Sequence, residues 1–145
     1  MCIRDRTITQ HNLETKAVPP RYRPVWIGLD YQDRAALYRR IDLRVENMLS
    51  NGLLDEIRAL LALGVSPKTT AMQAIGYKEF FGYLSGACSL DEATALCKQR
   101  SRNYAKRQLT WFRRNPDMHW LRMTGAEDFS DVLSAARQNI PFSAL

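Results

Sequence analysis

Residues 98–114 read KQRSRNYAKRQLTWFRR, and this stretch says more about the fold and the function of the chain than any other. It holds seven of the 21 Lys and Arg residues and no acidic residue. On a helix, at about 100° per residue, one face collects Cys97, Ser101, Tyr104, Ala105, Gln108, Leu109, Trp111 and Phe112. The opposite face is cationic. The stretch therefore predicts a long amphipathic helix with one largely apolar and one basic side.

The cationic side favours a surface that binds a polyanion. Its charges lie on two shoulders, one with Lys98, Arg102, Lys106 and Arg113, the other with Arg100, Arg107 and Arg114. Exposed helix faces usually mix signs to form i,i+4 pairs, and nothing within the run balances these cations. Basic residues interleaved with aromatic ones are typical of proteins that contact a phosphate backbone. The alternative is an ordinary solvated helix exterior.

Composition narrows the class of protein. With 145 residues, the chain fits one ordinary domain or a piece of a larger one, and 46% hydrophobic residues suffice for a packed core. The net charge of +6 and a pI of about 9.5 favour acidic partners. Three cysteines without a CxxC motif indicate a reducing compartment. Since no apolar run approaches the ~18 residues of a membrane span, we expect a cytoplasmic protein without membrane contact, and a monomer.

Local signals divide the chain into short elements. Residues 1–23 are expected to be an irregular leader, residues 24–140 the folded part, and residues 141–145 a tail. The folded part is predicted to contain, in order, a strand at 25–29, helices at 33–51, 53–63 and 71–85, the basic helix from the Ser89–Glu92 capping box to Asn115, a strand at 118–123 and a helix at 129–139. The fold class is α/β and mostly helical. Two short strands make a poor sheet alone, so both are expected to need neighbours that the chain does not supply.

Two further groups are candidate binding residues. In the segment Gln73–Lys78, Gly76 lies inside a predicted helix at a cost of ~1 kcal/mol relative to Ala, while Tyr77 and Lys78 suit a base and its phosphate. Helix–helix packing across the glycine is the alternative. Arg40 and Arg44, one helical turn apart, could clamp a diphosphate or simply cover an apolar stripe. No catalytic constellation, metal-ligand cluster or glycine-rich phosphate loop is present.

Several segments, in this order, carry a family resemblance. They are Leu37–Val45, Met48-Leu49, Gly52–Glu56, Ala71–Glu79 and Ser101–Arg113. From about Thr7 to Trp120 the chain resembles the C-terminal part of the bacterial tRNA dimethylallyltransferases, which prenylate the adenine next to the anticodon. Residues 1–6 match nothing in this family and are interpreted as a spurious start.

The resemblance implies a nucleotide-binding, P-loop-like α/β core and transfer of a dimethylallyl group from dimethylallyl diphosphate to N6 of adenosine 37, with Mg²⁺ assisting departure of the diphosphate. It implies contact with the tRNA anticodon stem-loop through Gln73, Ala74, Ile75, Gly76, Tyr77 and Lys78, and through Lys106, Arg107, Gln108, Leu109, Thr110, Trp111, Phe112 and Arg113. Arg40 and Arg44 match paired arginines near the active-site channel.

The chain departs from this family pattern in one important respect. The family's phosphate loop, general-base Asp and most of its insertion domain are not found in the sequence. We therefore expect a C-terminal fragment with no catalytic residue and no metal ligand, inactive by itself and without bound Mg²⁺. A free-standing basic helical RNA-binding module is the alternative function.

Overall fold

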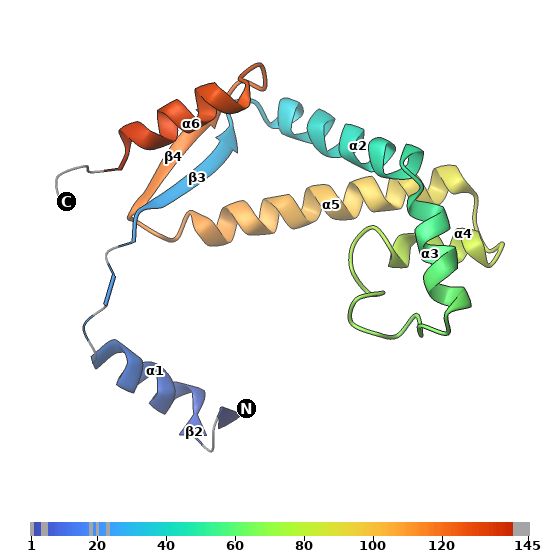
Figure 1. Cartoon of the computed structure of the whole chain (residues 1–145), viewed down its shortest axis with the longest axis horizontal. Helices are drawn as coiled ribbons and strands as arrows, with labels where there is room; N and C mark the ends of the chain where they lie inside the picture. Colours follow the sequence, from blue (N-terminus) through green and yellow to red (C-terminus); the bar gives the residue numbers. More distant parts are fainter. Residues whose placement is uncertain (1, 4–5, 18, 20, 23, 141–145) are drawn as a thin grey trace.

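Helices dominate the structure (Figure 1), and its strands form two two-stranded sheets: a short antiparallel one near the N-terminus and a longer parallel one, which we call the sheet. The computed structural model describes residues 2–3, 6–17, 19, 21–22 and 24–140. Its elements are β1 (Cys2–Ile3), β2 (Arg6–Thr7), α1 (Ile8–Ala17), β3 (Trp26–Tyr31), α2 (Arg34–Ser50), α3 (Leu53–Ala62), the 3₁₀ helix η1 (Lys78–Phe80), α4 (Phe81–Leu84), α5 (Leu90–Phe112), β4 (Met118–Met123) and α6 (Phe129–Gln138). The predicted mostly helical α/β class is confirmed.

The ends of the long helices follow from capping residues that the sequence displays. The carboxylate of Asp33 accepts hydrogen bonds from the backbone N–H groups of Ala35 and Ala36 and so begins α2. Ser89 and Glu92 form the predicted capping box and begin α5. The helix then continues for 23 residues, about 35 Å at 1.5 Å per residue. It runs from the α3–α4 end of the molecule to the sheet (Figure 1).

The two predicted strands pair with each other. β3 and β4 are parallel, with Gly28 opposite Trp120 and Asp30 opposite Arg122. Gly28 leaves room for the indole, because a Cβ at that position would lie 2.7 Å from Cε3 of Trp120. Within the described residues, no further strand joins this pair. The expectation that this chain supplies neither strand with a neighbour is therefore wrong, because each is the neighbour of the other.

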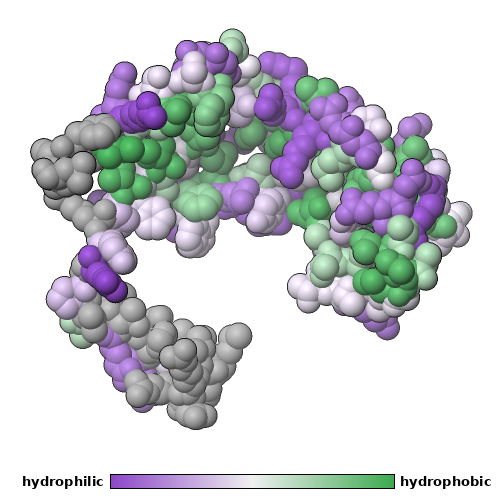
Figure 2. All heavy atoms as spheres, in the orientation of Figure 1, coloured by the Kyte–Doolittle hydropathy of each residue, from purple (hydrophilic) through white to green (hydrophobic). Residues whose placement is uncertain are grey.

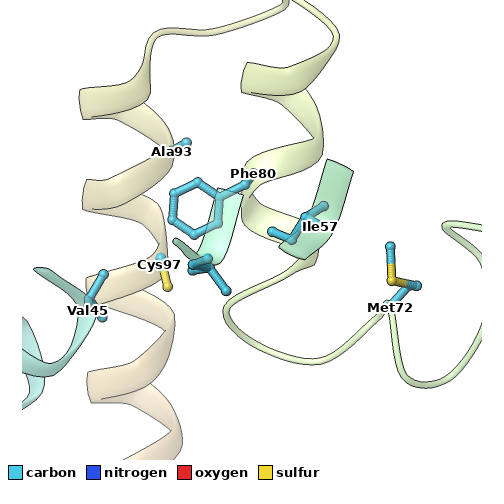
Figure 3. Close-up of a cluster of buried hydrophobic side chains, with 7 residues drawn as sticks. Val45, Ile57, Met72, Phe80, Ala93 and Cys97 are labelled. Carbon is cyan, nitrogen blue, oxygen red and sulfur yellow. The ribbon is translucent and has the colours of Figure 1, made fainter. Parts of the chain in front are cut away.

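The hydrophobic core lies at the end of α5 that is remote from the sheet. Figure 3 shows Phe80 of η1 between α3 and α5, close to Ile57 and Cys97. The buried set is Val45, Leu53, Ile57, Met72, Phe80, Ala93 and Cys97. Figure 2 shows hydrophobic side chains gathered over both ends of the molecule, with many hydrophilic ones along α2 between them. This core fixes the N-terminal half of α5, whereas its C-terminal half extends toward the sheet.

Two expectations about local structure are wrong. Residues 71–77 form turns rather than the start of a helix over 71–85, since Gly76 has φ of +107° and a helix needs a negative φ. The leader expected to be irregular contains α1. Thr7 and Gln10 cap this helix reciprocally, with Thr7 Oγ1 accepting from the Gln10 N–H and Gln10 Oε1 accepting from the Thr7 N–H. The predicted tail at 141–145 lies outside the described residues.

Candidate nucleic-acid interface

The basic run lies on α5 as predicted, but acidic residues from other elements neutralise much of it. Two ion pairs join α5 to α2: Lys98 Nζ lies 2.6 Å from Glu46 Oε1, and Arg102 Nη1 lies 3.0 Å from Asp42 Oδ2. The partners are four residues apart on each helix, so the pairs form a ladder between antiparallel helices. The next step would use Tyr38 of α2, which has no carboxylate. The ladder therefore stops before Lys106.

Two buried carboxylates bind two more of these cations. Arg100 Nη1 donates to Glu79 Oε1 at 2.9 Å, and Arg113 Nη2 donates to Asp30 Oδ2 at 2.8 Å. The expectation that the run is unbalanced is thus wrong for four of its seven cations. The acids are distant in sequence, and only the fold brings them to α5.

The remaining three cations are Lys106, Arg107 and Arg114, and all are exposed. Among the described residues, no carboxylate lies within ion-pair distance of any of them. With Asn103, Thr110 and Trp111 they line an open depression of about 430 Å³. We call this set the cation patch. Trp111 is 65% exposed and packs edge-on against Phe112, with ring centroids 4.9 Å apart.

The cation patch offers both charge and a flat ring on one side of α5. Phosphate groups are recognised by such cations, and bases stack on exposed aromatic rings. The Arg107 guanidinium also lies over the Tyr104 ring, 5.8 Å from its centroid. Asn103 and Arg114 belong to this patch although they lie outside the contact residues that the family resemblance implies. Arg114 follows Arg107 by seven residues, about two helical turns, which is the spacing that puts both on one basic shoulder of the helix.

The second predicted contact segment, 73–78, is a tight turn held by side-chain contacts. The buried N–H of Gly76 donates to Glu79 Oε2 at 2.8 Å. Gln73 Nε2 donates to the Pro67 carbonyl at 2.8 Å. The Tyr77 hydroxyl donates to Glu56 of α3, and this hydrogen bond raises the pKa of Tyr77. The Tyr77 ring is therefore held at its hydroxyl end, and Lys78 beside it is half-buried.

A cleft of about 540 Å³ joins the predicted segments. Its walls come from α2, the 73–78 turn and α5, and its lining includes Arg44, Ala74, Ile75, Gly76, Tyr104 and Gln108. Cys97 lines its buried side, and burial raises the pKa of that thiol.

A second cavity of about 450 Å³ lies between α5 and the sheet, and its lining includes Leu109 and Phe112. Both cavities reach Ala105 and Gln108, and Figure 2 shows the hollow between α2 and α5.

The predicted arginine pair does not share one cavity. Arg44 lines the 540 Å³ cleft, whereas Arg40 lines a separate depression of about 250 Å³ beside Arg39 and Tyr31. Both arginines are exposed. The spacing predicts a common helix face, but their side chains border different hollows. A joint clamp on one diphosphate therefore has less support than separate contacts.

The described residues do not fit a resident metal ion. They contain no group of three or more His, Cys, Asp or Glu side chains that could hold one. The two buried carboxylates, Asp30 and Glu79, are both bound by arginines. The Mg²⁺ that the resemblance implies has no ligand set in this part of the chain.

None of the described helices is long and apolar enough to cross a membrane.

Comparison with known proteins identifies the family. A family model described as IPP transferase matches residues 2–115, so the expectation that residues 1–6 match nothing in this family is wrong for residues 2–6. The chain belongs to the IPP transferase family. It is 50% identical over 113 residues to tRNA dimethylallyltransferase 1 of Pelobacter propionicus, and 44% identical over 116 residues to the tRNA dimethylallyltransferase of Acetivibrio thermocellus. These alignments cover 78% and 80% of the chain but only 36% and 37% of the relatives. The chain thus spans about a third of their length.

Solved structures of this family share the fold. The tRNA delta(2)-isopentenylpyrophosphate transferase of Staphylococcus epidermidis superposes with a TM-score of 0.75 and 35% identity, covering 89% of this chain and 41% of that one. The full-length tRNA isopentenylpyrophosphate transferase of Bacillus halodurans gives a TM-score of 0.74 at 40% identity, covering 89% and 42%. The arrangement of α2, α5 and the sheet therefore belongs to the IPP transferase fold.

Proposed function

We propose that this chain forms the tRNA-binding helical part of a prenyltransferase that moves a dimethylallyl group from dimethylallyl diphosphate to N6 of adenosine 37 in tRNA. Relatives named tRNA dimethylallyltransferase support the reaction. The observation that carries the RNA-binding role is the cation patch, because its three cations have no acidic partner among the described residues. The partner we propose is the anticodon stem-loop.

The proposed roles follow from what each group can bind. Lys106, Arg107 and Arg114 contact phosphates, and Trp111 stacks on an unpaired base. An exocyclic amine cannot react while its base is stacked, so the target adenosine must leave the stack before transfer. Arg44 lines the cleft beside the 73–78 turn and is placed to meet a phosphate or diphosphate there. The other parts of the reaction centre are assigned to no residue of this chain.

A free-standing RNA-binding module is the second candidate. It is favoured by the buried cluster that joins α2, α3, η1 and α5 within the chain itself. Such a module unfolds cooperatively when heated. A part that depends on further sequence shows broad, non-cooperative melting by circular dichroism.

Salt-dependent RNA binding tests the proposed interface. Each phosphate that a cation neutralises contributes about 0.7–0.9 to the slope of log affinity against log salt. We expect Lys106→Ala, Arg107→Ala and Arg114→Ala each to reduce the slope for an anticodon stem-loop by about that amount. Lys98→Ala and Arg102→Ala are the matched controls, since their partners lie on α2. Equal slope changes in both groups, or none in either, would contradict the assignment.

A further inference from the structure

Glu79 is a buried acid that none of the roles above explains. Its side chain has 0% exposure. Its two oxygens have different partners: Oε2 accepts the Gly76 N–H at 2.8 Å, and Oε1 accepts Arg100 Nη1 at 2.9 Å. Burying a carboxylate is costly unless it is paired and hydrogen-bonded. Here one carboxylate joins the backbone of the 73–78 turn to a side chain of α5.

The Gly76 end of this bridge controls the shape of the turn. Gly76 has φ of +107°, a conformation available mainly to glycine, and it lines the 540 Å³ cleft. Around it, the Ala74 carbonyl accepts hydrogen bonds from the N–H groups of Tyr77 and Lys78 at 3.2 and 3.4 Å. These bonds are longer than that to Glu79. The charged acceptor is therefore the strongest hydrogen-bond restraint on this backbone.

The Arg100 end places the bridge on the helix that carries the cation patch. Arg100 lies six residues before Lys106 on α5 and is 45% exposed. We propose that Glu79 is a positioning residue, which fixes the 73–78 turn against α5 and so holds the shape of the 540 Å³ cleft for the RNA. The proposal rests on the RNA-binding function proposed above. Glu79 itself contacts no RNA in this arrangement.

The direction of the effect separates positioning from simple electrostatics. Glu79 carries a negative charge, and removing such a charge from an RNA-binding protein should strengthen binding if only net charge matters. A positioning role gives the opposite sign, because the turn loses its restraint. Glu79→Gln keeps the size of the side chain and removes the charge. Glu46→Gln is the control, since Glu46 also pairs with a cation of α5 but is 56% exposed and lies on α2.

Amide hydrogen exchange in the full 145-residue chain tests the positioning directly. We expect the Gly76 amide to exchange about 10- to 100-fold faster in Glu79→Gln, the loss expected when a hydrogen bond to a charged group is weakened. In Glu46→Gln it should exchange as in the unaltered chain. If Glu79→Gln does not fold, the double variant Glu79→Gln/Arg100→Gln leaves no lone charge and gives the same comparison. Unchanged protection of Gly76 in a folded variant overturns the proposal.

Binding of an anticodon stem-loop oligonucleotide provides the second measurement. Glu79→Gln should weaken affinity about 5- to 30-fold with little change in salt slope, because no phosphate contact is removed. Glu46→Gln should bind as well as the unaltered chain or slightly better. Tighter binding by Glu79→Gln overturns the positioning role. An unaltered chain that does not bind the oligonucleotide contradicts the proposed function instead, and Gly76 exchange still decides whether Glu79 sets the turn.

Discussion

Arg113 and Asp30 fasten the last turn of the longest helix to the sheet. Arg113 is the C-cap of α5 and donates to Asp30 Oδ2 at 2.8 Å, and Arg122 of β4 donates to the same oxygen at 2.9 Å. Asp30 Oδ1 accepts the N–H of Tyr31 at 2.9 Å. The Asp30 side chain is 4% exposed. One carboxylate thus joins β3, β4 and α5, and Arg113 has a structural partner as well as its predicted RNA contact.

Removing this carboxylate should loosen that junction. Asp30→Asn is expected to lower the free energy of unfolding by about 1–3 kcal/mol, because two guanidinium groups lose the negative charge that they share. Urea denaturation of the full chain measures this free energy.

Arg113→Ala should also destabilise the chain but alter the salt slope of RNA binding less than Arg114→Ala does. A slope change as large as that of Arg114→Ala would show that Arg113 mainly contacts phosphate.

Replacing Gly76 by alanine should destabilise the protein. The sequence suggests a helical position, where alanine would be favoured by ~1 kcal/mol, but φ of +107° reverses the sign. The added Cβ would also lie 3.1 Å from Cε of Met48. We expect a loss of about 1–3 kcal/mol, measured by thermal melting.

Gly86→Ala separates backbone strain from crowding. Gly86 also has a positive φ, +78°, but a Cβ there meets nothing within 4 Å. We expect Gly76→Ala to lower both the melting temperature and RNA affinity, and Gly86→Ala to lower only the former. Higher stability of Gly76→Ala would contradict the turn conformation.

Acid should weaken the loop before α6. Glu127 accepts hydrogen bonds from the N–H and hydroxyl of Thr124 and from the N–H of Gly125. These contacts, the Thr124 N–H foremost, lower the pKa of Glu127 from 4.5 to about 2. Because its folded pKa is below the unfolded value, its stabilisation is complete above pH 4.5 and is lost as pH falls through about 2.

The Glu127→Gln variant tests this acid dependence. Its stability should fall less steeply between pH 5 and 2 than that of the unaltered chain, about the range that separates the two pKa values. Glu46→Gln removes the same charge from an exposed site on α2 and serves as the control. Identical pH profiles for all three proteins would show that the Thr124–Glu127 contact does not contribute.

The 145-residue chain alone should not transfer a prenyl group. Its sequence holds no glycine-rich phosphate loop, and positioning with charge stabilisation provides most of the rate of such reactions. Unmodified tRNA and labelled dimethylallyl diphosphate are incubated with the purified chain, beside the full-length Bacillus halodurans relative. Label above the no-protein background in the first reaction would contradict this expectation.

Helices and strands were predictable from the sequence where the residues that begin, end or pattern them lie within the element or next to it. Asp33 and the Ser89–Glu92 pair cap their helices as expected, and the strand at 118–123 has the predicted bounds. The helix predicted over 71–85 is absent at residues 71–77, because the glycine between Ile75 and Tyr77 takes a left-handed conformation that no sequence spacing reveals. α1 was missed because it lacks an apolar stripe, although its Thr7–Gln10 capping pair is visible in the sequence.

The candidate site was predictable in composition but not in charge balance. The basic residues and Trp111 all lie between positions 98 and 114, so the run itself stands out in the sequence. Its acidic partners do not: Asp42 and Arg102 are 60 positions apart, and Asp30 and Arg113 are 83 apart. Only the packing of α2 and the sheet against α5 brings them together. The run therefore has fewer free cations than its sequence alone predicts.

The α2–α5 ladder has a consequence for which substitutions the chain can accept. Both members of each ladder pair are residues of this chain, so their charges can be exchanged. The double variant Glu46→Lys/Lys98→Glu should therefore fold with the same topology. Beyond the ladder, a reversal at Lys106 has no compensating change among the described residues, because no carboxylate there pairs with it. The cations of α5 thus tolerate different changes: those of the ladder accept paired exchanges within the chain, whereas a charge reversal at Lys106 or Arg107 finds no such partner among the described residues.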